Sequence, residues 1–296
     1  MLFWIIFLAI LPQFNSYLPL HRKQVLPEKG TIKVLSYNVM GFNNLQKDKN
    51  NQNRILNYIK SQNPDIVCLQ EYAVSGNTKL VTQQDVDKAL EGFKYKSIVR
   101  VGNKNSYNKL ACFSKYPILS HERIDYKSQF NGSIAYRIVV ESDTILVVNN
   151  HFESNKITLE DKVFVERLLQ LEEQHDLIKE TKGLLRKIVD ASIIREKQAK
   201  AVVSYIDEAP ERRVIVCGDF NDSPLSRTNK LFADIQLKSA FSTSGFGLGI
   251  SYNQNMFYFR IDNILTNNNL KAYNCVVDNS IKDSDHYPIM CYIAKK

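Results

Sequence analysis

The sequence lacks the patterns that would place it at once in a disulfide-rich, zinc-binding or repeat class. Its five cysteines are odd in number, and they form no Cys-x-x-Cys pair and no cysteine–histidine spacing suited to zinc. Each cysteine lies in an apolar run, so we predict buried free thiols, a usage that favours a reducing compartment. Internal repeats and low-complexity tracts are absent as well. The 296 residues, 44% of them hydrophobic, suffice for one large domain or two small ones with a sizeable core.

The charge of the sequence limits its partners but does not identify one. No dense run of lysine and arginine marks a nucleic-acid-binding arm, because the basic residues are scattered along the chain. The formal net charge of +8 nevertheless favours polyanionic partners, namely nucleic acids, acidic lipid surfaces and phosphorylated small molecules. The function therefore has to be inferred from the positions of individual polar residues.

One long apolar run stands at the N-terminal end, over residues 2–11. It is too short for a spanning helix, which needs about 20 residues, and it lacks a basic n-region and a small-residue cleavage site. We interpret residues 1–20 as a membrane anchor, with a signal peptide or a helix packed on the core as alternatives. Residues 21–30 read as a linker and 31–296 as the main domain. We expect membrane association, with the side of the membrane open.

Within the main domain, short apolar runs end in polar side chains. Residues 214–217 read as a strand buried on both faces, and Gly218 then allows a turn into Asp219 and Asn221. Other runs end at Asn38, Glu71, His151, Asp285 and His286. Residues 257–265 read as one further strand, in which alternation places Arg260 and Asp262 on the same face.

These residue types suit chemistry on a phosphate. An acid and an amide two residues apart can orient a water molecule and donate to a phosphoryl oxygen. Two further acids with an asparagine offer hard oxygen ligands, which suit Mg²⁺ rather than zinc. Each residue taken singly is more often a turn residue, a neighbour of a helix cap or a core histidine. Six of them at equivalent strand ends indicate a functional site.

The stretch between the strand that ends at His151 and the strand over residues 214–217 is predicted to be helical and heavily charged, over residues 155–208, with a break near 181–183. Residues 153–190 exceed what a compact connection needs. We interpret this charged insertion as a solvated helical hairpin or, alternatively, as a lid that contacts substrate or membrane.

Several short motifs, in order, resemble those of the endonuclease/exonuclease/phosphatase superfamily, which includes DNase I-like nucleases, neutral sphingomyelinases and inositol polyphosphate phosphatases. They are Ser36-Tyr37-Asn38-Val39, Asp65-Ile66-Val67-Cys68-Leu69-Gln70-Glu71, Phe113-Ser114-Lys115-Tyr116-Pro117-Ile118, Asn150-His151-Phe152, Gly218-Asp219-Phe220-Asn221, Arg260-Ile261-Asp262 and Ser284-Asp285-His286-Tyr287-Pro288. The resemblance implies a four-layer α/β sandwich, in which two mostly antiparallel sheets pack face to face with helices outside.

The resemblance also implies a metal site. Glu71 would bind the catalytic Mg²⁺, for which Mn²⁺ could substitute, and Asn38 and Asp285 would complete or support the site. The implied reaction is the metal-assisted, in-line attack of water on a phosphoester.

The remaining roles that the resemblance implies fall on five residues. Asp219 would orient or deprotonate the attacking water, and Asn221 would hold a phosphoryl oxygen. Asp262 would fix the tautomer of His286, whose other ring nitrogen faces the phosphate. His151 would stabilise the charge that develops in the transition state.

Departures from the family pattern bear on the substrate. Abasic-site endonucleases carry a second polar residue shortly after the first asparagine and Thr-Lys after the metal-binding glutamate, whereas this chain has Met40-Gly41 and Tyr72-Ala73. We therefore expect a monomeric, Mg²⁺-dependent phosphoesterase that hydrolyses a phosphodiester, nuclease-like or acting on lipid headgroups. The alternative is a non-catalytic, membrane-tethered interaction module, against which the intact acids argue.

Overall fold

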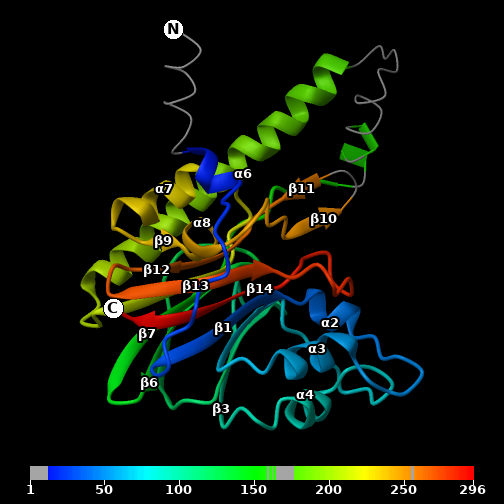
Figure 1. The fold of residues 1–296 in the computed structure, drawn as a ribbon. Coiled ribbons are helices and arrows are strands. Elements are labelled where there is room, and N and C mark those ends of the chain that lie inside the picture. Colours follow the sequence, from blue (N-terminus) through cyan, green and yellow to red (C-terminus); the bar gives the residue numbers. More distant parts are fainter. Residues whose placement is uncertain (1–12, 159, 162, 165–176, 255–256) are drawn as a thin grey trace, which may run out of the picture.

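The computed structural model describes residues 13–296 except 159, 162, 165–176 and 255–256. Two six-stranded sheets pack face to face, with helices on both outer faces (Figure 1). The first sheet has the order β13 (Leu270–Val277), β14 (Ile289–Lys295), β1 (Thr31–Asn38), β2 (Ile66–Gln70), β4 (Lys109–Ser114), β3 (Tyr95–Arg100). The second has the order β5 (Ile118–Arg123), β6 (Gly132–Val140), β7 (Asp143–His151), β8 (Arg213–Asp219), β12 (Asp262–Thr266), β9 (Lys238–Ser239). This is the four-layer arrangement that the sequence predicts.

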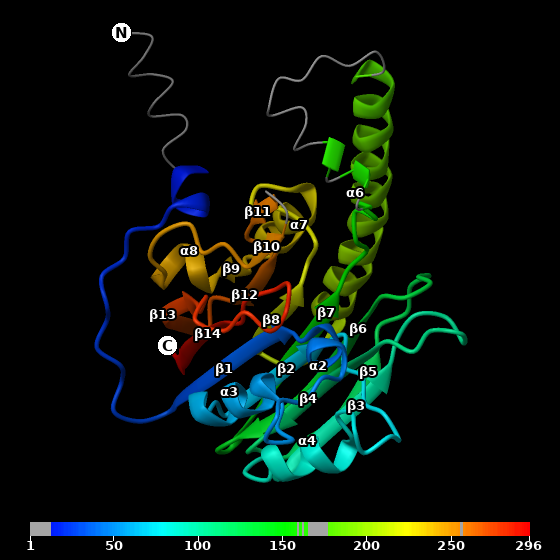
Figure 2. The same cartoon turned by 90° about the vertical axis from the view of Figure 1, so that its right-hand side faces the viewer.

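Helices cover the outer face of each sheet (Figures 1 and 2). The first sheet carries α3 (Arg54–Gln62) and α4 (Gln83–Ala89), with the short segment α2 (Met40–Asn44) beside them. The second carries α6 (Leu177–Glu208) and α7 (Arg227–Asp234), and α8 (Ala240–Ser244) packs against β12 and β13. A two-stranded hairpin, β10 (Tyr252–Gln254) and β11 (Phe257–Phe259), stands apart from both sheets.

Strand alternation accounts for the layers. In β8, Ile215 and Cys217 face the core between the sheets, whereas Val214 and Val216 face the core under α6 and α7. All four are buried, which confirms a strand covered on both faces. The five cysteines are buried and free, as predicted.

Each sheet contains one parallel pair of strands, β1 with β2 and β7 with β8, and its other pairs are antiparallel. Parallel neighbours end at the same edge of their sheet, so the polar residues that follow them meet there. Close approach of the second pair depends on Gly218, which has φ +128, and a Cβ built there would lie 2.0 Å from the Asn150 carbonyl oxygen. Strand topology therefore gathers the predicted residues at one edge.

Two predicted elements are wrong in detail. Residues 257–265 are not one strand, because β11 ends at Phe259 and β12 begins at Asp262 in a different sheet. The guanidinium of Arg260 bonds backbone carbonyls near the N-terminal end, while Asp262 reaches the site, so the two do not share a strand face. Likewise α6 is continuous through Gly183, where a break was expected, and its N-terminal half extends beyond the sandwich (Figure 2).

The N-terminal segment is described from residue 13, so the apolar run over 2–11 lies outside the described residues. A helical turn at 13–17 leads into irregular chain that bonds the body: His21 Nε2 lies 2.9 Å from the Ser242 carbonyl oxygen, and Gln24 exchanges two hydrogen bonds with the Asn274 side chain. Among the described residues, no helix combines the length and the apolar character that crossing a membrane requires. The division into anchor, linker and domain stays a prediction.

Candidate active site

The site lies where the two parallel strand pairs end. Asn38, the last residue of β1, is in register with Gln70 at the end of β2. In the facing sheet His151 of β7 is in register with Asp219 of β8, which also pairs with Asp262 of β12. The ends of five strands in two sheets thus converge at one edge.

Asp219 is at the centre of the site. Its Oδ2 accepts hydrogen bonds from Asn38 Nδ2 at 3.1 Å and from Asn221 Nδ2 at 3.2 Å. The Nε2 atoms of His151 and His286 each lie 3.6 Å from the same oxygen. Burial raises the pKa of Asp219, against the opposing effect of the nearby His286. A carboxylate with a raised pKa, surrounded by donors, is suited to accept a proton from water.

Glu71 stands next to this centre on the first sheet. Its Oε1 accepts a hydrogen bond from Asn38 Nδ2 at 3.0 Å and lies 3.6 Å from His151 Nε2. Glu71 has a positive φ of 52°, a region that non-glycine residues rarely occupy without a compensating reason. Its carbonyl oxygen is held by Gly41 N at 2.9 Å. The side chain is 37% exposed, so it faces the pocket rather than the core.

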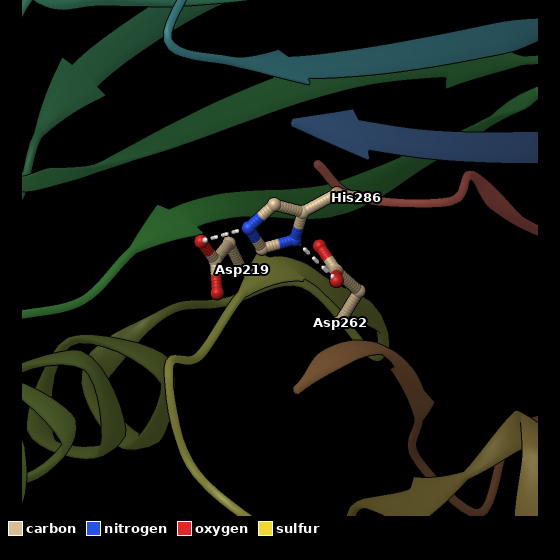
Figure 3. Close-up of side chains that lie close together, drawn as sticks. All are labelled: Asp219, Asp262 and His286. Carbon is tan, nitrogen blue, oxygen red and sulfur yellow. Dashed lines mark hydrogen bonds and ion pairs between the residues drawn. The ribbon is translucent and has the colours of Figure 1, made fainter. Parts of the chain in front are cut away.

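His286 lies between two buried acids, as Figure 3 shows: Nδ1 is 2.7 Å from Asp262 Oδ2, and Nε2 points toward Asp219. Burial by itself lowers the pKa of His286, but the carboxylates of Asp262 and Asp219 outweigh it and raise the pKa well above the ordinary value. A charged imidazolium can donate from both ring nitrogens, which matches an acid on each side. The geometry therefore holds His286 protonated and oriented.

A divalent cation fits at Glu71 and Asp285. Both acids line one pocket with Asp219, and burial, together with the charges of Glu71 and Asp219, raises the pKa of Asp285. Carboxylates that repel one another in this way favour a hard cation between them. Asn38 supports the site differently from its expected role, because its amide nitrogen faces the acids and its Oδ1 accepts from Met40 N at 3.2 Å. It would have to turn its amide to offer oxygen to a metal.

Asp219, Asp262 and His286 also satisfy the distances of a metal cluster, with ligand atoms within 4.8 Å of one another. However, the two nitrogens of His286 face two different acids, so a single ion could not replace both contacts. The imidazolium already supplies positive charge between the carboxylates. If a divalent cation binds, Glu71 and Asp285 are the acids that would hold it.

Two serines that were given no role hold the site together. Ser251 Oγ accepts from the backbone nitrogens of Ile261 and Asp262, both at 3.0 Å. Ser284 Oγ donates to the Asn38 carbonyl oxygen at 2.7 Å and accepts from His286 N at 3.2 Å, which ties the His286 loop to β1. Ser284 lies inside a recognised motif, but nothing in the sequence distinguishes Ser251.

The loop after His151 is fixed by α6. Arg195 is buried, and it donates to Asp222 Oδ2 at 3.1 Å, to the Glu153 carbonyl oxygen at 3.0 Å and to Asn155 Oδ1 at 2.8 Å. Gln198, one turn along α6, accepts from Glu153 N at 2.9 Å. The C-terminal half of α6 is thus part of the support for the site, whereas its N-terminal half is not.

Most of the predicted site residues line a cavity of about 200 Å³. Three acids border it, namely Glu71, Asp219 and Asp285, and an apolar wall comes from other residues, among them Ile157 and Phe259. Of the predicted site residues, Asn38 and Asp262 support this cavity from behind, and the other six line it.

The endonuclease/exonuclease/phosphatase family model matches residues 35–286, most of the main domain. The chain belongs to this family. The match spans the motifs described above, the last of them as far as His286, and it confirms the resemblance on which the site assignments rest. The protein is therefore a metal-dependent hydrolase of phosphoester bonds.

Solved structures with this fold support the assignment of the architecture. The human nocturnin catalytic domain with bound sulfate is 16% identical, with a TM-score of 0.64, covering 93% of this chain and 98% of that one. A family protein from Bacteroides vulgatus is 17% identical, with a TM-score of 0.63, covering 90% and 100%. D. rerio TDP2 in complex with a single-strand DNA product is 18% identical, with a TM-score of 0.61, covering 90% and 100%. A comparison with curated sequences finds no significant match.

Proposed function

We propose that the protein hydrolyses phosphodiesters by in-line attack of water activated by Asp219. The observation that carries this proposal is the position of Asp219 Oδ2, which two amides and two imidazoles surround within 3.6 Å. These donors stabilise the charge of the carboxylate and hold its oxygen in one position. A base that aligns water with a phosphorus atom requires both.

The neighbouring residues then share the stabilisation of charge. His286, held by Asp262, donates toward the phosphate once substrate displaces part of its contact with Asp219, and His151 donates from the opposite side. Asn221 Nδ2 is engaged by Phe152 O at 3.0 Å and by Asp219, so it turns from these acceptors to a phosphoryl oxygen on binding. Glu71 and Asp285 would hold a divalent cation, Mg²⁺ by preference and Mn²⁺ as a substitute, which would supply polarisation of the phosphoryl group.

The charge of the cavity favours a diester over a monoester. Three acids line it, and its positive side chains are already engaged: Lys156 is 2.9 Å from the carboxylate of Glu153, and the His286 imidazolium contacts Asp262 at 2.7 Å. A diester carries one negative charge and a monoester up to two near neutral pH, so the monoester is repelled more strongly. A nuclease-like substrate and a lipid headgroup both satisfy this condition.

An assay with chromogenic substrates tests the proposal. Purified protein with Mg²⁺ should hydrolyse bis(4-nitrophenyl) phosphate faster than 4-nitrophenyl phosphate, and Asp219→Asn should lower the diester rate by roughly 10²–10⁴-fold. Asp207→Asn, on the exposed C-terminal part of α6, is the matched control and should keep the rate. No hydrolysis of any phosphoester by folded protein would favour the alternative, a non-catalytic interaction module.

We also propose that residues 1–20 associate the protein with a membrane. The support is the apolar run over residues 2–11, whose exposure to water would cost about 25 cal/mol for each Å² of apolar surface. The full chain should sediment with membranes and resist extraction by salt. A fully soluble full-length chain would refute the proposal.

A further inference from the structure

Exposed apolar side chains gather around the described start of the chain. Phe14, Tyr17 and Leu20 are 48%, 41% and 60% exposed, and Phe246 and Leu248 are 70% and 56% exposed. Tyr258 on β11 is a further member, at 52%. We call these six residues the apolar end face. Scattered exposed apolar residues are ordinary on a folded protein, but a contiguous group marks a surface that contacts something.

Hydrogen bonds make this group one surface. Leu20 forms an isolated β-bridge with Phe246, and the adjoining backbone is joined by a bond from Gly247 N to the Pro19 carbonyl oxygen at 2.8 Å. The segment at 245–250 is therefore fixed against the start of the described chain. Both carry their large side chains outward, so the exposure is a property of the folded arrangement.

Arg260 links the same surface to the site. Its guanidinium is buried and donates to the carbonyl oxygens of Ser16, Tyr17 and Leu248, and it stacks on the Phe241 ring at 4.4 Å. Arg260 stands between β11 and Asp262 in the chain. The helical turn at 13–17 is thus held in a defined direction relative to the catalytic residues.

The protruding half of α6 adds apolar residues at the same end of the molecule. Leu185, Val189 and Ile193 recur every four residues, which places them on one side of the helix, and they are 55%, 54% and 50% exposed. In both Figure 1 and Figure 2 this half of α6, the turn at 13–17 and the β10–β11 hairpin lie toward the end of the molecule away from α4.

The chain itself indicates what this end contacts. The apolar run over 2–11 precedes the turn at 13–17 in the sequence. Arg22 and Lys23 are exposed just after Leu20, and Lys282 lines the hollow that Phe246, Leu248 and Tyr258 border. Apolar side chains with basic residues at their rim match the interface of a bilayer that contains anionic lipids.

We propose that the apolar end face docks on the surface of an anionic bilayer and turns the catalytic cavity toward the headgroups. Tyr258 of the face and Phe259 are neighbours in β11, and Tyr258 lines the hollow beside Phe246 and Leu248 whereas Phe259 lines the catalytic cavity, so β11 stands between the docked surface and the cavity. The phosphodiester that the enzyme hydrolyses is then one presented at the bilayer. This inference rests on the proposed membrane association and phosphodiesterase activity, and it adds a defined orientation.

A fluorescent label on the face tests the docking directly. The five native cysteines are buried, so Phe246→Cys in the full chain offers one exposed thiol for an environment-sensitive dye. With phosphatidylcholine vesicles that contain phosphatidylglycerol, the dye should shift to the blue and be quenched by a nitroxide attached to the lipid chains. The matched control is Tyr107→Cys, since Tyr107 is 84% exposed on a loop before β4 and should show neither change.

The possible results separate the three proposals. If the chain floats with vesicles but the dye at position 246 stays in water, residues 1–12 alone hold the protein and the docked face is refuted. Equal quenching at 246 and 107 would show unspecific adsorption, which also refutes it. If the chain does not bind vesicles, both the docking and the membrane association are refuted. Hydrolysis of the soluble diester, measured without vesicles, decides the catalytic proposal separately and should be unchanged in both labelled variants.

Discussion

Replacing Asp262 with asparagine is a direct test of how His286 is held. The substitution preserves shape and removes a buried charge 2.7 Å from His286 Nδ1. An asparagine can offer its nitrogen or its oxygen to that ring atom, so it no longer favours a proton on Nδ1. A neutral ring is then free to place its single proton on Nε2, toward Asp219. A charged ring, the imidazolium, loses one of the two acids that stabilise it.

The magnitude follows from the separation. Two unit charges at 2.7 Å attract by about 6 kcal/mol at an effective dielectric constant of about 20. The cost of burying both charges offsets part of this, and breaking a buried pair usually costs about 3–5 kcal/mol. If that loss falls on the transition state, the rate falls by roughly 10²–10⁴-fold, at about 1.4 kcal/mol for each factor of ten.

The assay is a double-mutant cycle on the soluble diester. Asp262→Asn, His286→Gln and the double variant should all lose about the same factor in kcat, because residues that act as one unit give non-additive losses. Circular dichroism and thermal unfolding establish that each variant is folded. Asp207→Asn again serves as the unaffected control.

Two results would refute the reasoning. If the double variant loses the product of the two single losses, the residues act independently and the pair does not exist as a catalytic unit. If Asp262→Asn is folded and loses less than about tenfold, the acid is not needed to orient the ring, despite its short contact.

Four further predictions concern the metal, two buried arginines and the N-terminal segment. Chelation by EDTA should abolish activity, Mg²⁺ or Mn²⁺ should restore it, and Glu71→Ala should lose the metal dependence together with the rate; full activity in excess EDTA would contradict this. Arg195→Met should lower the free energy of unfolding by about 3–5 kcal/mol because it leaves Asp222 unpaired, and Asp222→Asn should recover part of that loss in denaturant titrations. Arg260→Met should cost about 2–4 kcal/mol by stranding carbonyl oxygens, with the rate on the soluble diester nearly kept. A chain that starts at Glu28 loses two of these contacts, those with Ser16 and Tyr17, and we expect it to stay folded and active at a lower unfolding midpoint; an insoluble or molten product would show that the segment belongs to the core.

The sequence by itself was sufficient to predict the strands that are buried on both faces. The strands at β2 and β8 are continuous apolar runs because helices cover one face and the other sheet covers the second, so no polar residue can interrupt them. The polar residues that end them were therefore visible as exceptions. The parallel pairing of β1 with β2 and of β7 with β8, which the structure shows, then brings Asn38, His151 and Asp219 to one edge.

Two of the strands at the edges of the sheets, β5 and β13, were not evident in the sequence. β5 is exposed along nearly its whole length, and β13 contains an irregularity between Tyr273 and Val276, so neither shows a regular apolar alternation. The break between Phe259 and Asp262 was hidden for the opposite reason, because the apolar alternation continues through it. Which sheet a residue joins depends on the strands that pair with it. A local pattern of apolar residues indicates burial but not which strands pair.

Tertiary structure alone decided the contacts that adjust the chemistry. The amide of Asn38 presents its nitrogen to Glu71 and Asp219 because its oxygen is already occupied by a backbone donor. Arg260, read as a neighbour of Asp262 on one strand, instead holds the start of the described chain. The identities of the acids and histidines were readable from the sequence, because they adjoin apolar runs, although Asp262 begins a strand and Asp285 and His286 lie on the loop before β14. Their protonation and direction come from residues far apart in the chain, whose charges and hydrogen bonds act only once folding has brought them within a few ångströms.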